Sequence, residues 1–460
     1  MMMDLKLKHI DRFNLLNILY CIFPITMALG NLATNLNIFF IVILGLFTFK
    51  EKLFQIRKDN VSVLVALFFI CIIISSFLNY YNFSNLTFNN NEYFYNNARY
   101  DFDAKMGIFK SLAFLRFFLI YFILTKLIEV DKFNIKIFFF MAAGISFFLI
   151  IDLMFQLIFY IDLFGNKYDK SVHRLSGFFG TEYIAGGFLQ RFSLYLIFLF
   201  PFLWFKNKAN LTKLFFFTIS FLVFFSILMT NNRMPLILFF LSFVFFTFFY
   251  KKFRKLSFYA LVFLFFSFSI IYSFNSRINN FFNSYKNQAY DIVKVFTKRD
   301  EINNLDITIS SNSNYAMLFN SSIDLSQKNK ILGLGIKSFY FNCFKNLKVI
   351  IKMTKPTPGR SCNNHPHNYY LEILTTSGIL GLLFIILIFL MTIKKFLFRY
   401  NQINENEYHK KLILLVSFII FITEIFPIRS SGAFFTTSSA TLIFILLAIV
   451  NNLKMSNIKL

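Results

Sequence analysis

The sequence predicts an all-α integral membrane protein with about twelve transmembrane helices and one large loop, between the ninth and tenth helices. Of the 460 residues, 57% are hydrophobic, a share typical of proteins whose solvent is lipid. The apolar residues form runs long enough to cross a bilayer as helices. The Lys and Arg residues behind the net charge of +25 stand in short clusters between these runs. Their charge therefore indicates membrane orientation rather than a nucleic-acid partner.

Twelve runs of about 18 or more mainly apolar residues are candidate spans. They lie near residues 12–29, 33–49, 61–79, 107–127, 135–160, 187–205, 212–230, 234–250, 256–274, 368–393, 411–427 and 432–450. The first run resembles a signal peptide, but the many similar runs after it favour an uncleaved span. The chain then divides into nine spans within 1–274, a loop over 275–367, and three spans within 368–460.

The basic clusters predict a cytoplasmic N-terminus. If Lys6, Lys8 and Arg12 stay in the cytoplasm, every even-numbered span returns the chain there. The basic turns then fall on that side: 50–58, 126–136, 206–213, 251–255, 394–411, and the lysines at 454 and 459. The segment 275–367 falls on the outer side. It is too long and polar for a simple connection, so we expect it to be functional or a small folded cap.

Two cysteines of the outer loop, Cys343 and Cys362, would face an oxidising compartment. We therefore expect a disulfide between them, worth about 3 kcal/mol by the chain-entropy relation. With His365 and His367 they also offer four potential zinc ligands. The short histidine spacing and the long gap between the cysteines make zinc the weaker alternative.

Three arginines stand within a few residues of predicted helix ends on the outer side: Arg174, Arg233 and Arg429. A guanidinium group is a permanently charged planar fork that fits phosphate oxygens. Converging arginines could therefore hold a diphosphate at the membrane surface. The alternative is that each one is an interfacial anchor reaching toward the lipid headgroups.

Arg116 and Asp152 lie inside predicted spans, where an ionisable residue ordinarily needs a partner. Counted at ~1.5 Å per residue from the outer ends, they reach similar depths. We expect a structural ion pair between them, with a role beneath the substrate site as the alternative.

His365 and His367 immediately precede the tenth predicted span. Imidazole, with an ordinary pKa near 6.5, is the side chain best able to take a proton from a hydroxyl at neutral pH. We favour a catalytic role over a merely packed or solvated pair.

The same stretch resembles the O-antigen ligase and polymerase superfamily. The family signature is a histidine followed by Asn, Ser or Gln, nine residues, and Gly-x-x-Gly; here it reads His367-Asn368, residues 369–377, and Gly378-Ile-Leu-Gly381. Supporting similarities are Arg174 to Gly177, Arg233 at the start of a span, and Gly333 to Gly335. In motif terms the resemblance covers roughly residues 170–395.

The resemblance implies a multi-pass protein of the bacterial inner membrane whose active site faces the periplasm. Such enzymes transfer glycans from undecaprenyl diphosphate without metal or other cofactor. Arginines would hold the donor diphosphate, and His367 would be the general base. His365, Asn368 and Arg429 are further candidates for substrate binding. Glu372 and Glu424 could orient His367 or an arginine.

A diphosphate compensated by arginines is a good leaving group, and direct displacement inverts the anomeric carbon. The acceptor is a lipid A core sugar for a ligase of lipopolysaccharide biosynthesis, or a second carrier-linked unit for a polymerase. We favour ligation. One departure from the family is that no arginine stands just before Tyr315. Rival readings are a transporter or flippase and a membrane scaffold without activity.

Overall fold

The computed structural model describes residues 11–53, 55, 59–84, 104–168, 174–205, 208–298, 314–339, 363–404, 407–429 and 432–453. These residues are helical, with one isolated β-bridge between Ile161 and Lys167. The helices of the first half are α1 (Arg12–Cys21), α2 (Phe23–Ala28), α3 (Asn31–Phe49), α4 (Asn60–Ser84), α5 (Ala104–Glu129), α6 (Ile135–Phe159), α7 (Ala185–Phe198) and α8 (Phe200–Trp204). They are followed by α9 (Ala209–Met229), α10 (Arg233–Phe249), α11 (Arg254–Phe274), α12 (Ser276–Thr297), α14 (Asn314–Ser326), α18 (Tyr369–Gln402), α19 (Tyr408–Glu424) and α20 (Thr437–Asn452). Short 3₁₀ turns lie at Lys50–Leu53, Gly177–Phe179, Lys251–Phe253 and Gln327–Asn329.

Eight helices of the described chain are long and apolar enough to cross a membrane, while α10 and α20 are apolar but shorter. The predicted class, an all-helical membrane protein with several spans, is confirmed. The number twelve stays a prediction. Two predicted spans are interrupted by proline: the run 12–29 breaks between α1 and α2, next to Pro24, and the run 187–205 breaks between α7 and α8, next to Pro201. Proline has no N–H to continue a helix.

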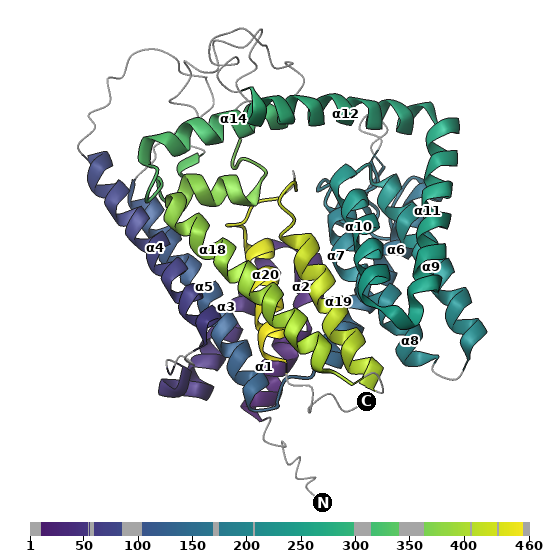
Figure 1. The fold of residues 1–460 in the computed structure, drawn as a ribbon, viewed down its shortest axis with the longest axis horizontal. Helices are drawn as coiled ribbons and strands as arrows, with labels where there is room; N and C mark the ends of the chain where they lie inside the picture. The colour runs from purple at the N-terminus through teal and green to yellow at the C-terminus, as the bar shows by residue number, and fades with distance from the viewer. Residues whose placement is uncertain are drawn as a thin grey trace, which may run out of the picture.

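The helices form two groups, joined by α19 and by the short helices α1 and α2, which pack on both α3 and α6 (Figure 1). In the first group α4 packs against α5 and α18, and α5 also packs against α3 and α20. In the second group α7 packs against α6, α9 and α10, and α10 packs against α11. Helix α19 contacts α18 and α20 on one side and α7 and α10 on the other. Helix α20 is buried from Ser439 to its last residue, so it lies in the core of the first group.

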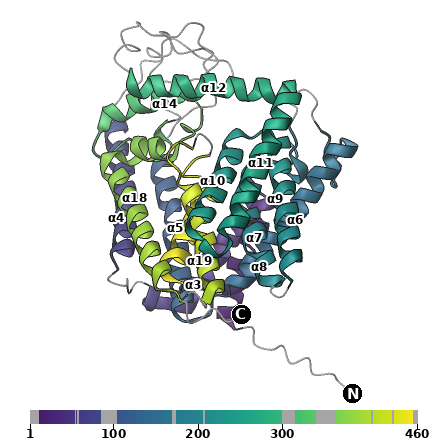
Figure 2. The same ribbon diagram turned by 45° about the vertical axis from the view of Figure 1, so that its right-hand side comes forward.

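The outer-loop segment contributes two helices that lie across one end of the bundle, as both views show (Figures 1 and 2). Chain direction changes at Asn275, whose side chain accepts hydrogen bonds from the backbone N–H groups of Arg277 and Ile278 and caps α12. Helix α14 then packs against α18. The basic turn Lys251–Phe253 lies at the other end of α11. This agrees with the predicted orientation, which itself stays a prediction.

Helix α18 is broken at Gly378, whose φ of 65° and ψ of −165° are not helical. The nine residues 369–377 form a half-helix about 13 Å long in front of the break. Backbone of the segment 330–335 inserts there: Leu334 N–H donates to the carbonyl of Thr375 (2.8 Å), and Gly335 N–H donates to that of Thr376 (2.8 Å). The two glycine motifs therefore meet in space.

Gly333 and Gly378 must be glycine because the facing backbone leaves no space for a Cβ atom. A Cβ on Gly378 would lie 2.2 Å from the carbonyl oxygen of Ile331, and one on Gly333 would lie 2.5 Å from the backbone nitrogen of Gly378. Polar side chains of α4 hold the inserted segment: Ser75 donates to the carbonyl of Leu332, and Asn79 donates to that of Gly333 (3.0 Å). The break therefore fixes where the half-helix 369–377 ends.

Candidate functional site

The half-helix begins at Asn368, directly after the motif histidine. The Asn368 side chain accepts hydrogen bonds from the N–H groups of Tyr370 (3.0 Å) and Leu371 (3.1 Å), and so caps α18. Its amide group also donates to the carbonyls of Pro427 (2.8 Å) and Arg429 (3.2 Å). Asn368 thus ties the start of α18 to the segment after α19. Its predicted contact with substrate stays a prediction.

His367 has a left-handed backbone with φ 58°, an unfavourable conformation that is held by the structure around it. Its ring lies 4.2 Å from the ring of His365 and 5.7 Å from that of Tyr315, measured between centroids. Its Nε2 lies 3.1 Å from the amide nitrogen of Asn363. The ring is half-buried, so it is ordered by its neighbours and still reachable.

Burial lowers the pKa of His367 to about 4. For His365 the pKa falls to about 3, mainly through burial and further through the charges of His367 and Lys337. Desolvation disfavours the charged imidazolium form. Both rings are therefore neutral at pH 7, and a neutral imidazole has a lone pair that can accept a proton.

Arg174 and Arg233 lie near each other and near Tyr315. The guanidinium of Arg174 lies 5.8 Å from the Tyr183 ring centroid, and that of Arg233 lies 5.5 Å from the Tyr285 ring centroid. Arg233 also donates to Gln288 of α12 (3.4 Å). The charge of Arg233 interacts with that of Arg174 and with the phenol of Tyr315.

The contacts of Tyr315 connect these arginines to His367. Tyr315 lies in the first turn of α14, and its ring meets the His367 ring edge-on. Arg233 therefore interacts through its charge with Arg174 and with Tyr315, and Tyr315 contacts His367, although these residues come from distant parts of the chain. In the structure, the charge of Arg233 interacts with the phenol of Tyr315, before which the sequence has no nearby arginine.

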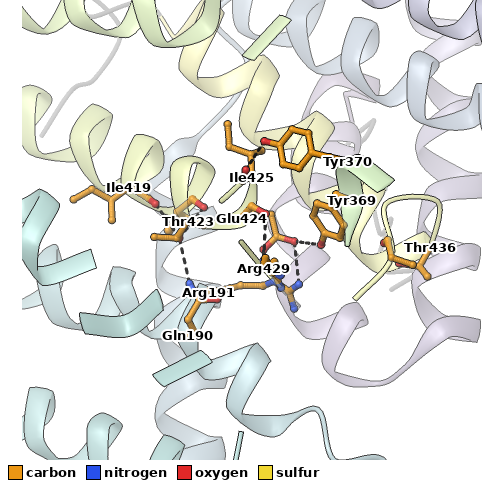
Figure 3. A network of polar contacts seen from close by, with 12 residues as sticks. Gln190, Arg191, Tyr369, Tyr370, Ile419, Thr423, Glu424, Ile425, Arg429 and Thr436 are labelled. Carbon is orange, nitrogen blue, oxygen red and sulfur yellow. Dashed lines mark hydrogen bonds and ion pairs between the residues drawn. The ribbon is translucent and has the colours of Figure 1, made fainter. Parts of the chain in front are cut away.

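Arg429 lies in a buried ionic network with Glu424 (Figure 3). The carboxylate of Glu424 accepts two hydrogen bonds from Arg191 (2.7 and 2.9 Å), one from Arg429 (2.6 Å) and one from the hydroxyl of Tyr369 (2.6 Å). Two cations surround one anion, so the cluster carries a net positive charge. It joins α7, α18 and α19, and thereby both helix groups.

Arg116 and Asp152 do not form the expected ion pair in the described structure. Arg116 donates to Thr437 (3.1 Å), while Asp152 accepts from the N–H groups of Leu163 (2.8 Å) and Phe178 (2.6 Å). The reason is helix packing: α5 lies against α3, α4 and α20, whereas α6 lies against α2 and α7. A similar predicted depth in the bilayer therefore did not mean that Arg116 and Asp152 are neighbours.

Cys343 and Cys362 lie outside the described residues, and so do the predicted disulfide and the zinc alternative that uses them. Sequence reasoning missed Arg191, Tyr369 and Lys337 at the site. Arg191 could have been found from the sequence, because it lies inside a predicted span and an arginine there needs a partner. Glu424 does contact an arginine, one of the roles considered from sequence.

The fold and these contacts define a multi-span membrane protein in which cations and two imidazoles gather where a broken helix begins. The family model described as O-antigen ligase matches residues 218–386. The matched region includes Arg233, Tyr315 and the motif from His367 to Gly381, and it excludes Arg174. This match confirms the resemblance to the O-antigen ligase superfamily and supports a ligase- or polymerase-type role in O-antigen processing. No curated protein matches the chain.

Proposed function

We propose that the protein transfers a glycan from undecaprenyl diphosphate to a sugar hydroxyl at the periplasmic face of the bacterial inner membrane. The supporting observation is the series of interactions from Arg174 and Arg233 through Tyr315 to His367. Two guanidinium groups suit the donor diphosphate, and a neutral imidazole suits the acceptor hydroxyl. The proposed acceptor is the lipid A core, with a second carrier-linked unit as the alternative.

The proposed reaction is a direct displacement. His367 removes the proton of the acceptor hydroxyl as its oxygen attacks the anomeric carbon, and the carrier diphosphate leaves from the opposite face. The configuration at that carbon is therefore inverted. Arg174 and Arg233 stabilise the charge that grows on the leaving diphosphate.

The test uses purified full-length protein with carrier-linked glycan and either rough lipopolysaccharide or further carrier-linked repeat. Under ligation the lipopolysaccharide lengthens, and under polymerisation the carrier-linked glycan lengthens. Transfer to neither acceptor, with the protein folded, would overturn the proposed function. The anomeric configuration of the new linkage, read by NMR, tests inversion separately.

The proposal predicts that Arg233→Gln and Arg174→Gln each lower kcat/KM for the donor. Loss of one charge-assisted contact is worth about 1.5–3 kcal/mol, so we expect a decrease of roughly ten- to a hundredfold. Initial rates at varied donor concentration measure it. Arg277→Gln, an exposed arginine of α12, is the matched control and should leave the rate unchanged. Unaltered donor kinetics in both site variants would contradict the assignment.

The pH dependence should differ between the free and donor-bound protein. Because burial lowers the pKa of His367 to about 4 in the free protein, kcat/KM should fall only as the pH drops through about 4. A bound diphosphate is negative and favours the protonated imidazolium, so the acid limb of kcat should lie at higher pH. Rates between about pH 3 and 8 measure both limbs. An acid limb of kcat/KM near pH 6.5 would indicate an imidazole with an ordinary pKa, and would contradict the prediction that burial lowers the pKa of His367.

A further inference from the structure

Lys337 follows the inserted segment, whose backbone is fixed on two helices. Gly335 N–H donates to the carbonyl of Thr376 in α18 (2.8 Å), and Ile336 N–H donates to the hydroxyl of Ser76 in α4 (3.4 Å). Ser338 N–H then bonds back to the Gly335 carbonyl (3.2 Å), closing a turn around Lys337. The position of the lysine is therefore set by the broken helix itself.

The backbone of Lys337 is left-handed, with φ 67°, a conformation that favours glycine or asparagine. Its neighbours Ile336, Ser338 and Phe339 are buried, whereas Lys337 is half-exposed. A strained lysine in a well-packed turn is the kind of outlier from which a function can be inferred.

The surroundings of Lys337 are suited to an anion. Its charge interacts with Lys110 of α5, with His365 and with Glu372. The carboxylate of Glu372 accepts a 2.5 Å hydrogen bond from the N–H of Phe434. Within the described residues, neither Lys337 nor Lys110 forms an ion pair. Two like charges held together repel each other, and a bound anion would relieve this repulsion.

His365 supplies a second, independent observation. Its Nε2 is buried and has no hydrogen-bond partner among the described residues. A buried polar atom without a partner is costly, and a ligand group can satisfy it. His365 interacts with the charge of Lys337, and its ring centroid lies 4.2 Å from that of His367.

We propose that Lys337, Lys110 and Nε2 of His365 bind an anionic group, a phosphate or a carboxylate, on the glycan acceptor. This inference rests on the proposed function. Lys110 lies on α5, and the turn around Lys337 is hydrogen-bonded to α4 and α18. Arg233 begins α10, which belongs to the other helix group (Figures 1 and 2). His367 contacts Tyr315, whose phenol interacts with the charge of Arg233. His365 interacts with the charge of Lys337, so the two histidines have one set of cations on either side of them in this series of interactions. Direct displacement needs this order, with the base between donor and acceptor.

An anionic acceptor has two sources. The diphosphate of a second carrier lipid would supply it in polymerisation, and a phosphorylated or acidic core sugar would supply it in ligation. The same cations could recognise either group, because both present oxygen acceptors with negative charge. The source of the anionic group can therefore be identified by finding which acceptor binds more weakly when the charge of Lys337 is removed.

The experiment compares Lys337→Gln with the wild type at saturating carrier-linked donor. Four acceptors carry the same terminal sugar: a neutral alkyl glycoside, a prenyl diphosphate-linked glycan, a phosphorylated core oligosaccharide and a glycan with a uronic acid. We expect KM to rise about tenfold for the anionic acceptor that is used, equivalent to ~1.4 kcal/mol, and to stay unchanged for the neutral acceptor and for the donor. Lys337→Gly removes the charge and also the left-handed strain, so the same loss in that variant excludes misfolding as the cause.

Two controls complete the test. Lys337→Arg should retain the preference for anionic acceptors, and Lys330→Gln, an exposed lysine of the same segment, should behave like the wild type. Equal loss for neutral and anionic acceptors, or a change confined to the donor KM, would overturn the inference. Binding of the phosphorylated glycan to His367→Ala protein gives a readout that does not need turnover. If wild-type protein transfers nothing but this binding still depends on Lys337, the proposed function fails and the anion site stands.

Discussion

His367→Ala is expected to abolish most glycan transfer while the protein remains folded in the membrane. A positioned general base contributes about 10²–10⁴-fold to the rate, so kcat should fall by that factor. The donor should still bind, because its proposed ligands, Arg174 and Arg233, are untouched. The measurement is single-turnover transfer from carrier-linked glycan, with donor binding followed in parallel on the same preparation.

The matched control is His409→Ala, a histidine at the start of α19, at the opposite end of that helix from Glu424. It should retain full transfer. A structural role for His367 would lower thermal stability and donor binding together, whereas a base leaves both unchanged. Undiminished kcat in the alanine variant would remove His367 from the mechanism.

The fold class could be predicted because hydropathy reports directly on which segments lipid can surround. The predicted runs coincide with described helices, including the short pairs α1–α2 and α7–α8 that proline separates. What the sequence did not reveal is the break in α18. The nine residues between Asn368 and Gly378 were visible in the sequence as part of the family pattern. In the structure these nine residues are the half-helix 369–377. The length of this half-helix depends on the segment 330–335, which is distant in sequence.

The candidate site was predicted in part for the same reason. His367 and Arg233 stand at helix ends, where polar residues beside apolar runs are conspicuous. Arg174 was also expected near a helix end, but it lies in the connection between α6 and α7. Its charge interacts with that of Arg233, which interacts with Tyr315 beside His367. Pairing inside the bundle could not be derived from sequence. Depth along a helix is countable, but which helices are neighbours is a property of the packed fold, and Arg116 and Asp152 show the difference.

Arg429 illustrates the limit most clearly. From sequence it was a diphosphate ligand or an interfacial anchor, but in the structure its guanidinium contacts the carboxylate of Glu424, which Arg191 also holds from α7. A guanidinium engaged in this way can contribute positive potential to the site while its position is fixed by the carboxylate. Direct contact of Arg429 with substrate stays a prediction.

Glu424→Gln is expected to be among the most destabilising single substitutions in the chain. The carboxylate is fully buried and balances part of the charge of two buried arginines. Removing one partner of a buried ion pair costs about 3–5 kcal/mol, because a charge is left without its counter-charge. Unfolding by SDS titration in mixed micelles should therefore show a loss of that size, with lower transfer because Tyr369 begins α18.

A comparison of variants with different net charge in the cluster distinguishes the loss of a counter-charge from a general loss of packing. With Arg191, Arg429 and Glu424 present the cluster is +1; without the glutamate it is +2, and without Arg191 it is neutral. Arg191→Met, which introduces an apolar side chain of similar length, should therefore cost less than Glu424→Gln: it removes only the Arg191–Glu424 ion pair and leaves that of Arg429 in place. Glu182→Gln, an exposed glutamate, is the control and should change stability little. A larger loss from Arg191→Met than from Glu424→Gln would show that hydrogen-bond geometry, rather than net charge, dominates the cluster.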